Sequence, residues 1–157
     1  MGDTFTRLSD TVASSEGKVF ITINGQNRDL FEVQSCKAQI DLIVQERRIL
    51  GNRMTQHKVV GATGTGSATL YFMNSQQLKN TIEYIKSGKF ANNKLQMWNE
   101  DPQSTIGRQE VVLSNVIFKT ILAAAVDESD DPISFDSDFT FDGIENLKSF
   151  ALPENYR

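Results

Sequence analysis

The chain has 157 residues, of which 39% are hydrophobic and 23% are charged. This length suits one domain with one core, and the composition excludes a wholly disordered protein. No stretch reaches the run of about 18 apolar residues that a membrane-spanning helix needs, and the first residues lack the pattern of a secretory signal. We therefore expect a protein that has no membrane partner and stays in the cytoplasm until it is assembled or released.

The charge is distributed unevenly along the chain. The net charge is −4, but residues 127–157 contain nine acidic and two basic residues, whereas residues 1–126 contain fourteen basic and eleven acidic ones. Binding to a nucleic-acid backbone calls for clustered lysine and arginine, so this composition disfavours that function. An acidic end on a basic remainder instead favours self-association.

Few residues in the sequence could build a catalytic or metal site. Cys36 is the single cysteine and His57 the single histidine, so no intrachain disulfide and no thiolate cluster can form. We expect Cys36 to be a small buried hydrophobe and His57 to be solvated or at an interface. The sequence therefore predicts no catalytic, cofactor or metal site.

Residues 1–16 are polar and lack periodicity, which predicts a flexible amino-terminal arm. Apolar side chains then alternate over residues 18–23, which predicts a first strand. Asn24 and Gly25 follow it and signal a tight hairpin turn.

A second strand is predicted from about residue 30 to residue 44. Its apolar positions change from odd to even near Gln34 and Ser35, and a change of phase predicts a bulge or a sharp bend. Beyond the bend one face is apolar, and the opposite face carries only polar side chains. These are Ser35, Lys37, Gln39 and Asp41.

Residues 45–60 break the alternation and predict a long basic loop. Arg47, Arg48, Arg53 and Lys58 are interleaved there with apolar side chains that a solvated loop does not need. Loops of this length within a domain are usually functional or mobile.

Three glycines, Gly61, Gly64 and Gly66, then lead into a predicted strand at 67–73. They do not form a phosphate-binding loop, because no G-K-[ST] follows and the next residues alternate as a strand does. At the entry of a strand such glycines mark a bulge, a bend or the close approach of another backbone.

One helix is predicted between Asn74, which can cap its start, and Gly88, which suits its left-handed end. Gln77 stands at the third helical position of this prediction. Leu78, Ile82 and Ile85 form a narrow apolar stripe, and we expect that stripe to pack on the flank of a sheet.

The remaining segments predict further strands. They lie at 94–99, at 109–120 with an apolar continuation to 126, and at 133–142. In the last of these, Ile133, Phe135, Phe139 and Phe141 alternate with Ser134, Asp136, Asp138, Thr140 and Asp142. This pattern predicts a strand with an aromatic face and an acidic face.

Together the elements predict a mainly β protein with one helix (α+β). We expect an antiparallel β-sandwich or part-barrel flanked by an α-helix, with an extended amino-terminal arm and a long loop. The single domain is expected over residues 17–146, between the arm at 1–16 and a carboxy-terminal tail at 147–157.

The segment GNRMTQHKVVGATGTGSATLY at residues 51–71 resembles the tail-tube (core tail) proteins of contractile phages and phage-like particles, the PBSX-like family. The matching positions are Gly51, Arg53, Met54, Thr55, His57, Lys58, Gly61, Gly64, Thr65, Gly66, Ala68, Thr69 and Tyr71. Elsewhere the resemblance is in the layout of the elements. Residues 1–16 are longer than the usual arm, and the chain after Asp142 departs from the family.

The resemblance implies a non-enzymatic structural subunit without a cofactor. Such subunits form hexameric rings that stack into a hollow tube inside a sheath, and each subunit contributes four strands to a continuous inner barrel. The implied partners are further copies of the chain, the sheath protein, the baseplate or initiator and the tape-measure protein, with DNA only as transient cargo. The implied location is a virion tail or phage-like particle assembled in the host cytoplasm.

Two sets of residues are candidates for the contacts of such a tube. The resemblance places an inter-ring contact on the basic loop, through Arg47, Arg48, Arg53, Met54, His57 and Lys58. The polar strand faces supply lumen candidates, which are Lys37, Gln39, Asp41, Asp136 and Asp138. We expect a net negative or mixed lumen in which Lys37 is the exception; the rival placement turns Asp136 and Asp138 outward, toward a sheath.

Other functions stay open at the level of sequence. One is a tube protein of the type VI secretion kind, and another is a small ligand-binding β-barrel, which would be a closed monomer or dimer with an apolar pocket. A third, disfavoured by the composition, is a hydrolase that uses Asp136 and Asp138, or Glu100 and Asp101, as paired carboxylates.

Overall fold

Nine strands and one α-helix build the fold in the computed structural model, which describes residues 5–157. The strands are β1 (Gly17–Ile23), β2 (Gln26–Asp29), β3 (Val33–Arg48), β4 (Thr55–Tyr71), β5 (Asn93–Glu100), β6 (Arg108–Ser114), β7 (Ile117–Phe118), β8 (Ser134–Phe141) and β9 (Gly143–Lys148). Helix α1 spans Gln76–Ser87, and short 3-10 turns lie at Leu8–Asp10 and Glu154–Tyr156. The predicted mainly β fold with a single helix is confirmed.

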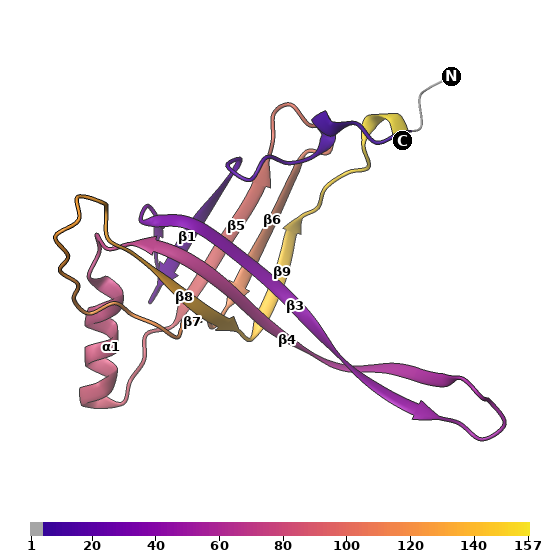
Figure 1. Ribbon diagram of the computed structural model, residues 1–157, viewed down its shortest axis with the longest axis horizontal. Helices are drawn as coiled ribbons and strands as arrows, with labels where there is room; N and C mark the ends of the chain where they lie inside the picture. Colours follow the sequence, from indigo (N-terminus) through magenta and orange to yellow (C-terminus); the bar gives the residue numbers. More distant parts are fainter. Residues whose placement is uncertain (1–4) are drawn as a thin grey trace.

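The strands form two antiparallel sheets that pack face to face (Figure 1). The five-stranded sheet has the order β2-β1-β5-β6-β9, and the four-stranded sheet has the order β3-β4-β8-β7. The core between them is formed by Val19, Ile21, Ile23, Leu30, Ala68, Leu70, Leu95, Leu113, Val116, Phe118, Phe139 and Phe141. Within residues 5–157 neither sheet closes on itself, so the fold is a sandwich and not a closed barrel.

The bulge predicted near Gln34 and Ser35 is confirmed. Val33 pairs with Leu70 and Ser35 pairs with Thr69, so Gln34 is the extra residue of β3. An extra residue reverses the alternation of a strand, which is the change of phase seen in the sequence. The turn at Asn24 and Gly25 is also present, with φ values of +50° and +87°.

The long loop predicted at 45–60 is wrong, because most of it is a β-hairpin. Strand β3 continues to Arg48 and β4 begins at Thr55, so only residues 49–54 form a turn. A second register shift lies here: Ile43 pairs with Gly61 and Val44 with Val59. This shift, together with solvent on both faces, removes the alternation that would have identified two strands.

The glycines lie inside β4 and not at its entry. A Cβ on Gly64 would stand 2.6 Å from Cδ2 of Phe141, and one on Gly66 would stand 2.6 Å from Cε2 of Phe139. Two aromatic rings of β8 therefore cover the places where these two residues have no side chain. The expected approach of another backbone is confirmed at Gly66, whose Cβ would lie 2.5 Å from the Lys37 carbonyl oxygen, and the expected bulge is confirmed beside Gly61, where Val60 is the extra residue of β4.

The helix is where the sequence predicts it, but its stripe is not buried. Asn74 Oδ1 accepts a hydrogen bond from the N–H of Gln76 at 2.8 Å, and Gly88 ends the helix at φ +78°. The helix begins at Gln76, so Gln77 is its second residue. Ile82 and Ile85 are exposed by 42% and 74%, which corrects the prediction that the whole stripe packs on a sheet.

The single strand predicted at 109–120 is two strands in different sheets. Strand β6 ends at Ser114, Asn115 adopts a positive φ of +53°, and β7 then pairs with β8 in the four-stranded sheet. Residues 121–126 do not continue β7. Strand β9 was not predicted; it pairs with β6 and runs to Lys148, two residues beyond the expected end of the domain.

Part of the predicted arm contacts the body of the protein. Asp10 is buried, and its Oδ1 accepts hydrogen bonds from the N–H and the hydroxyl of Thr105 at 3.0 and 2.6 Å. The Thr105 hydroxyl in turn accepts from the N–H of Glu154 at 3.0 Å. Residues 1–4 lie outside the described residues, and the flexibility of the arm remains a prediction.

Candidate functional site

The register of the four-stranded sheet brings the two predicted polar faces together. Lys37 of β3 pairs with Ser67 of β4, which pairs with Asp138 of β8. Thr69 likewise links Ser35 to Asp136. Because residues that pair across a sheet point to the same side, the lumen candidates lie on one continuous face, opposite the core.

The middle of this face was missed by the sequence analysis. It consists of short hydroxyl side chains from β4, namely Thr63, Thr65, Ser67 and Thr69. The signal was present as an alternation with small residues, but the neighbouring glycines obscured it. The Thr69 hydroxyl donates a hydrogen bond of 2.7 Å to Asp136, so this threonine holds the Asp136 carboxylate in place on β8.

Both signs of charge occur on the face. Asp41, Asp136 and Asp138 are acidic and Lys37 is basic, as the sequence indicates. Lys119, just after β7, adds a second cation, and it lines an open depression of about 320 Å³ together with Lys37 and Asp138. None of the four ion pairs found among residues 5–157 involves these five side chains.

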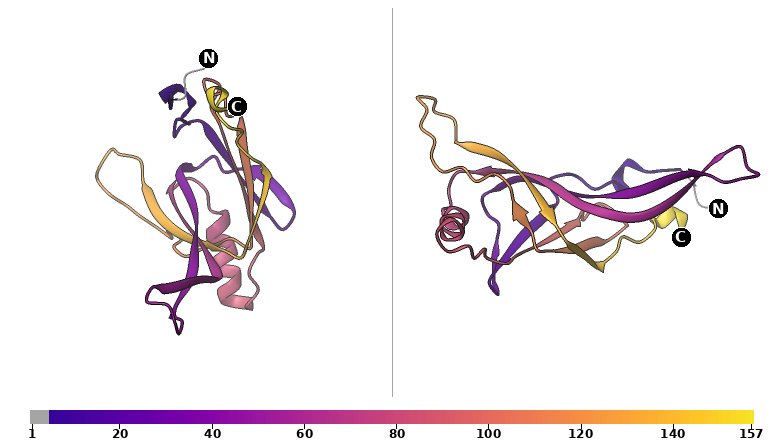
Figure 2. Two further views of the ribbon diagram at one scale, coloured as in Figure 1. Left: turned by 90° about the vertical axis from the view of Figure 1, so that its right-hand side faces the viewer. Right: turned by 90° about the horizontal axis from the view of Figure 1, so that it is seen from below.

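The second candidate region is the hairpin of β3 and β4, which projects from the sandwich (Figures 1 and 2). Strand β8 pairs with β4 only over Gly64–Tyr71, so residues 55–63 pair with β3 alone. A two-stranded ribbon by itself is marginally stable in water. The projecting part of this hairpin therefore depends on other contacts to be rigid.

The basic candidates are distributed over both arms and the turn of the hairpin. Arg47 and Arg48 end β3, His57 and Lys58 lie on β4, and Arg53 with Met54 belongs to the turn. His57 Nε2 lies 3.4 Å from Glu46 Oε1 across the two strands, with both side chains exposed. The structure thus places all six candidates at one end of the molecule.

The hairpin turn exposes apolar side chains at its apex. The N–H of Asn52 donates to the carbonyl of Ile49 at 3.1 Å, and Gly51 has a φ of +90°, as the third residue of a type II turn requires. Leu50 is fully exposed, and Met54 is exposed by 76%. Exposed apolar side chains at the tip of a ribbon favour a contact surface.

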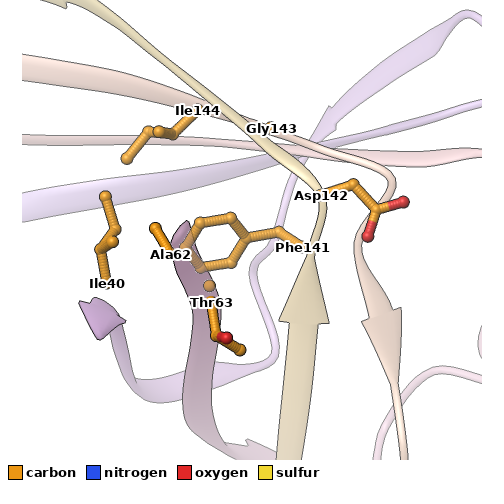
Figure 3. A pocket seen from close by; sticks show the side chains of 8 residues that line it. Ile40, Ala62, Thr63, Phe141, Asp142, Gly143 and Ile144 are labelled. Carbon is orange, nitrogen blue, oxygen red and sulfur yellow. The ribbon is translucent and has the colours of Figure 1, made fainter. Parts of the chain in front are cut away.

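A further hollow, next to the polar face, is open to solvent and does not resemble an enclosed ligand site. An open depression of about 510 Å³ is lined by Ile40, Ala62, Phe141 and Ile144 where β8 turns into β9 (Figure 3). The carboxylate of Asp142, at its rim, is turned away from the Phe141 ring and accepts a hydrogen bond from Asn115. Residues 5–157 contain no group of three His, Cys, Asp or Glu side chains that could hold a metal ion.

Cys36 has the environment of an inert thiol. It is half-buried against the core, and this burial raises its pKa to about 11. The thiolate, which is the reactive form, is therefore scarce at neutral pH.

The one α-helix among residues 5–157 is too short and too polar to cross a membrane.

Similarity to known proteins identifies the family. A family model described as phage tail tube protein matches residues 4–148. The chain is 30% identical over 146 residues to the uncharacterized protein YqbM of Bacillus subtilis (strain 168), covering 91% of this chain and 97% of YqbM. It is 28% identical over 139 residues to the phage-like element PBSX protein XkdM of the same organism, covering 88% and 92%.

Solved structures share the fold at low sequence identity. A chain in the cryo-electron microscopy structure of the anti-feeding prophage tube-terminating cap superposes with a TM-score of 0.66 at 10% identity, covering 94% of this chain and 96% of that one. A chain of the PVC sheath-tube complex in its extended state superposes with a TM-score of 0.57 at 11% identity, covering 83% of this chain and 88% of that one. Since the family model spans nearly all of the sequence, the chain belongs to the phage tail tube protein family and is a structural tail-tube subunit.

Proposed function

We propose that the chain forms hexameric rings that stack into the inner tube of a contractile particle, with the polar face of the four-stranded sheet lining the channel. The observation that carries this proposal is the continuity of that face. Strands β3, β4 and β8 present hydroxyl, amide and charged groups on one side and the core on the other. Such a two-sided sheet suits a wall between a protein interior and a channel filled with water.

The number of strands agrees with an open channel. Six copies of the four-stranded sheet would supply about 24 strands, spaced about 4.8 Å apart and tilted by about 40°. The backbone of that barrel would be about 50 Å across, which leaves room for a duplex of DNA or another extended cargo. Strand β3 is the edge of its sheet among the described residues, so its outer edge is available for pairing with a neighbouring copy, which would continue the barrel.

The charges of the face suit passage without binding. Three aspartates outnumber Lys37 and Lys119, and the central row consists of short hydroxyl groups. A polyanion is repelled by a net negative wall, whereas clustered lysine and arginine would hold its phosphates. The channel wall would therefore let a polyanionic cargo slide.

The proposal also assigns partners. The anti-feeding prophage baseplate contains a chain of this fold, with a TM-score of 0.60 at 12% identity, and so does the PVC sheath-tube complex. By analogy, the outer surface of the tube would face a sheath protein, and its ends would meet a baseplate or initiator and a tape-measure protein. The particle would be a phage tail or phage-like particle assembled in the host cytoplasm, with DNA only as transient cargo.

Electron microscopy of the concentrated pure protein tests the proposal. We expect hollow rings or tubes whose amount rises with protein concentration and whose end-on averages have six-fold symmetry. A monomer or dimer at every concentration would contradict the proposal and would favour a small binding protein instead.

A further inference from the structure

We propose that the tip of the hairpin docks onto the acidic segment 126–131 of a second copy of the chain. This inference rests on the proposed tube and names the partner surface of the hairpin. The hairpin tip is here defined as residues 48–54, and the acidic segment as residues 126–131, in the connection between β7 and β8. The contact would join a group of apolar side chains flanked by cations to an apolar residue that is followed by carboxylates.

The hairpin tip has the composition of a docking knob. Leu50 is fully exposed at its apex, and Ile49 and Met54 are exposed by half or more. Arg48 and Arg53 flank these apolar side chains, and neither forms an ion pair among the described residues. Apolar side chains with a charged rim are the usual arrangement of a protein interface.

The acidic segment complements the hairpin tip both in its exposed apolar side chain and in the sign of its charges. Val126 is fully exposed, and four carboxylates follow it within five residues: Asp127, Glu128, Asp130 and Asp131. All four are exposed and none is in an ion pair among residues 5–157. The hydrogen bonds found here run within the segment, from the N–H of Ser129 to Asp127 and from the N–H of Asp131 to Ser129.

The two surfaces lie at opposite ends of the molecule. In Figure 1 and in the right-hand view of Figure 2, the hairpin extends to one side, while the connection between β7 and β8 lies with helix α1 at the other. One copy cannot bring its own hairpin to its own acidic segment. Repeated head to tail, a contact between two different patches builds rings or filaments, as the proposed tube requires; made reciprocally, the same contact would build a two-fold dimer.

The exposed stripe of helix α1 is a less suitable partner for the tip. Ile82 and Ile85 are apolar, but Lys79 and Lys86 lie on the same helix and Lys89 follows it. These three cations, opposed only by Glu83, would repel the arginines of the hairpin. Charge complementarity therefore selects the acidic segment.

Two double variants with opposite charge changes test this contact. The hairpin variant carries Arg48→Glu and Arg53→Glu, and the segment variant carries Asp130→Lys and Asp131→Lys. A third chain combines all four changes. The matched control for the hairpin variant is Lys18→Glu with Lys94→Glu, which makes the same change in net charge as that variant, on exposed positions of β1 and β5 away from both surfaces. Circular dichroism establishes that each variant is folded.

Assembly is measured by sedimentation and electron microscopy as the concentration at which rings or tubes appear. Each double variant alone should raise that concentration by about tenfold or more, because attractive pairs become repulsive and tenfold corresponds to only about 1.4 kcal/mol. An equal mixture of the two double variants should assemble again, since each reversed surface then finds a complementary one. The four-change chain should also assemble, and the control should behave as the wild type.

The outcomes separate this inference from the tube itself. If the wild type assembles and either double variant assembles equally well, the tip and the segment are not in contact. If both double variants fail and neither the mixture nor the four-change chain recovers, the contact is likewise overturned while the tube proposal stands. A wild-type chain that never assembles would contradict the tube proposal itself.

Discussion

Phe139 of β8 lies across Gly66 of β4, so that the ring occupies the space where any other residue would have a side chain. The ring is fully buried, and it contacts the rings of Phe118 and Phe141 at centroid distances of 5.4 and 6.5 Å. Gly64 and Gly66, in the glycine-rich segment by which the sequence resembles the family, therefore serve the packing of the core. They let three aromatic rings fill the core beneath the polar face.

Replacement of Gly66 by alanine should destabilise the subunit. The new Cβ would displace the Phe139 ring and approach the Lys37 carbonyl, and overpacking of this kind costs about 1–3 kcal/mol. Gly61→Ala is the matched control, because its Cβ would meet Cδ1 of Ile43 at an ordinary 3.5 Å. Urea denaturation should show a loss of stability for Gly66→Ala but not for Gly61→Ala. Equal unfolding midpoints for the two variants would contradict the role of Gly66 in packing the Phe139 ring.

The hydrogen bonds of Asp10 should make the attachment of residues 5–16 sensitive to acid. The side-chain hydroxyl and the N–H of Thr105 lower the pKa of Asp10 below its ordinary value. A lowered pKa stabilises the folded form above the pKa of the unfolded chain, and that contribution disappears as the pH falls through the folded value.

Hydrogen exchange of residues 5–16 measured against pH checks this expectation. Protection should fall on acidification in the wild type and should already be low at neutral pH in Asp10→Ala. Asp29→Asn, an exposed aspartate of β2, is the control and should resemble the wild type. Protection that does not respond to pH would show that Asp10 does not hold this segment.

The sequence could predict features that depend on neighbouring residues. The bulge at Gln34 was found from a change of phase, and Gly88 located the end of the helix, because these signals are local. Asn74 predicted the helix start one residue early, since the N-cap residue is Ser75. The helix stripe was wrongly assigned to the core, since an apolar stripe does not reveal whether its cover lies in the same subunit. Asn115 was missed as a boundary because one residue with a positive φ leaves little trace in a strand pattern.

Features that depend on pairing between strands distant in the chain could not be predicted from the sequence. Lys37 and Asp138 are about a hundred positions apart, and only the register through Ser67 places them on one face. The hairpin was read as a loop because its projecting part has water on both sides, so no alternation marked its strands. The candidate residues were proposed as neighbours in the chain, and their arrangement in space became visible only from the pairing of the strands.

The projecting hairpin should become ordered on assembly. In the free subunit, the amides of residues 42–63 should exchange faster than those of β5 and β6, because the ribbon lacks a third strand. In assembled tubes the same amides should be protected by the neighbouring copy. Hydrogen exchange with mass spectrometry compares the two states, and equal protection in both would mean that the hairpin is rigid without a partner.

The location of the polar face is tested most directly by labelling assembled tubes. Cysteine is introduced at Asp138 in a chain that carries Cys36→Ala, and a second chain carries cysteine at Lys94 on the exposed face of β5 as the control. If the four-stranded sheet lines the channel, a bulky thiol reagent should label position 94 rapidly and position 138 hardly at all, whereas a small reagent that enters from the tube ends should label both. Rapid labelling of position 138 by the bulky reagent in intact tubes would place that face outside and contradict the account.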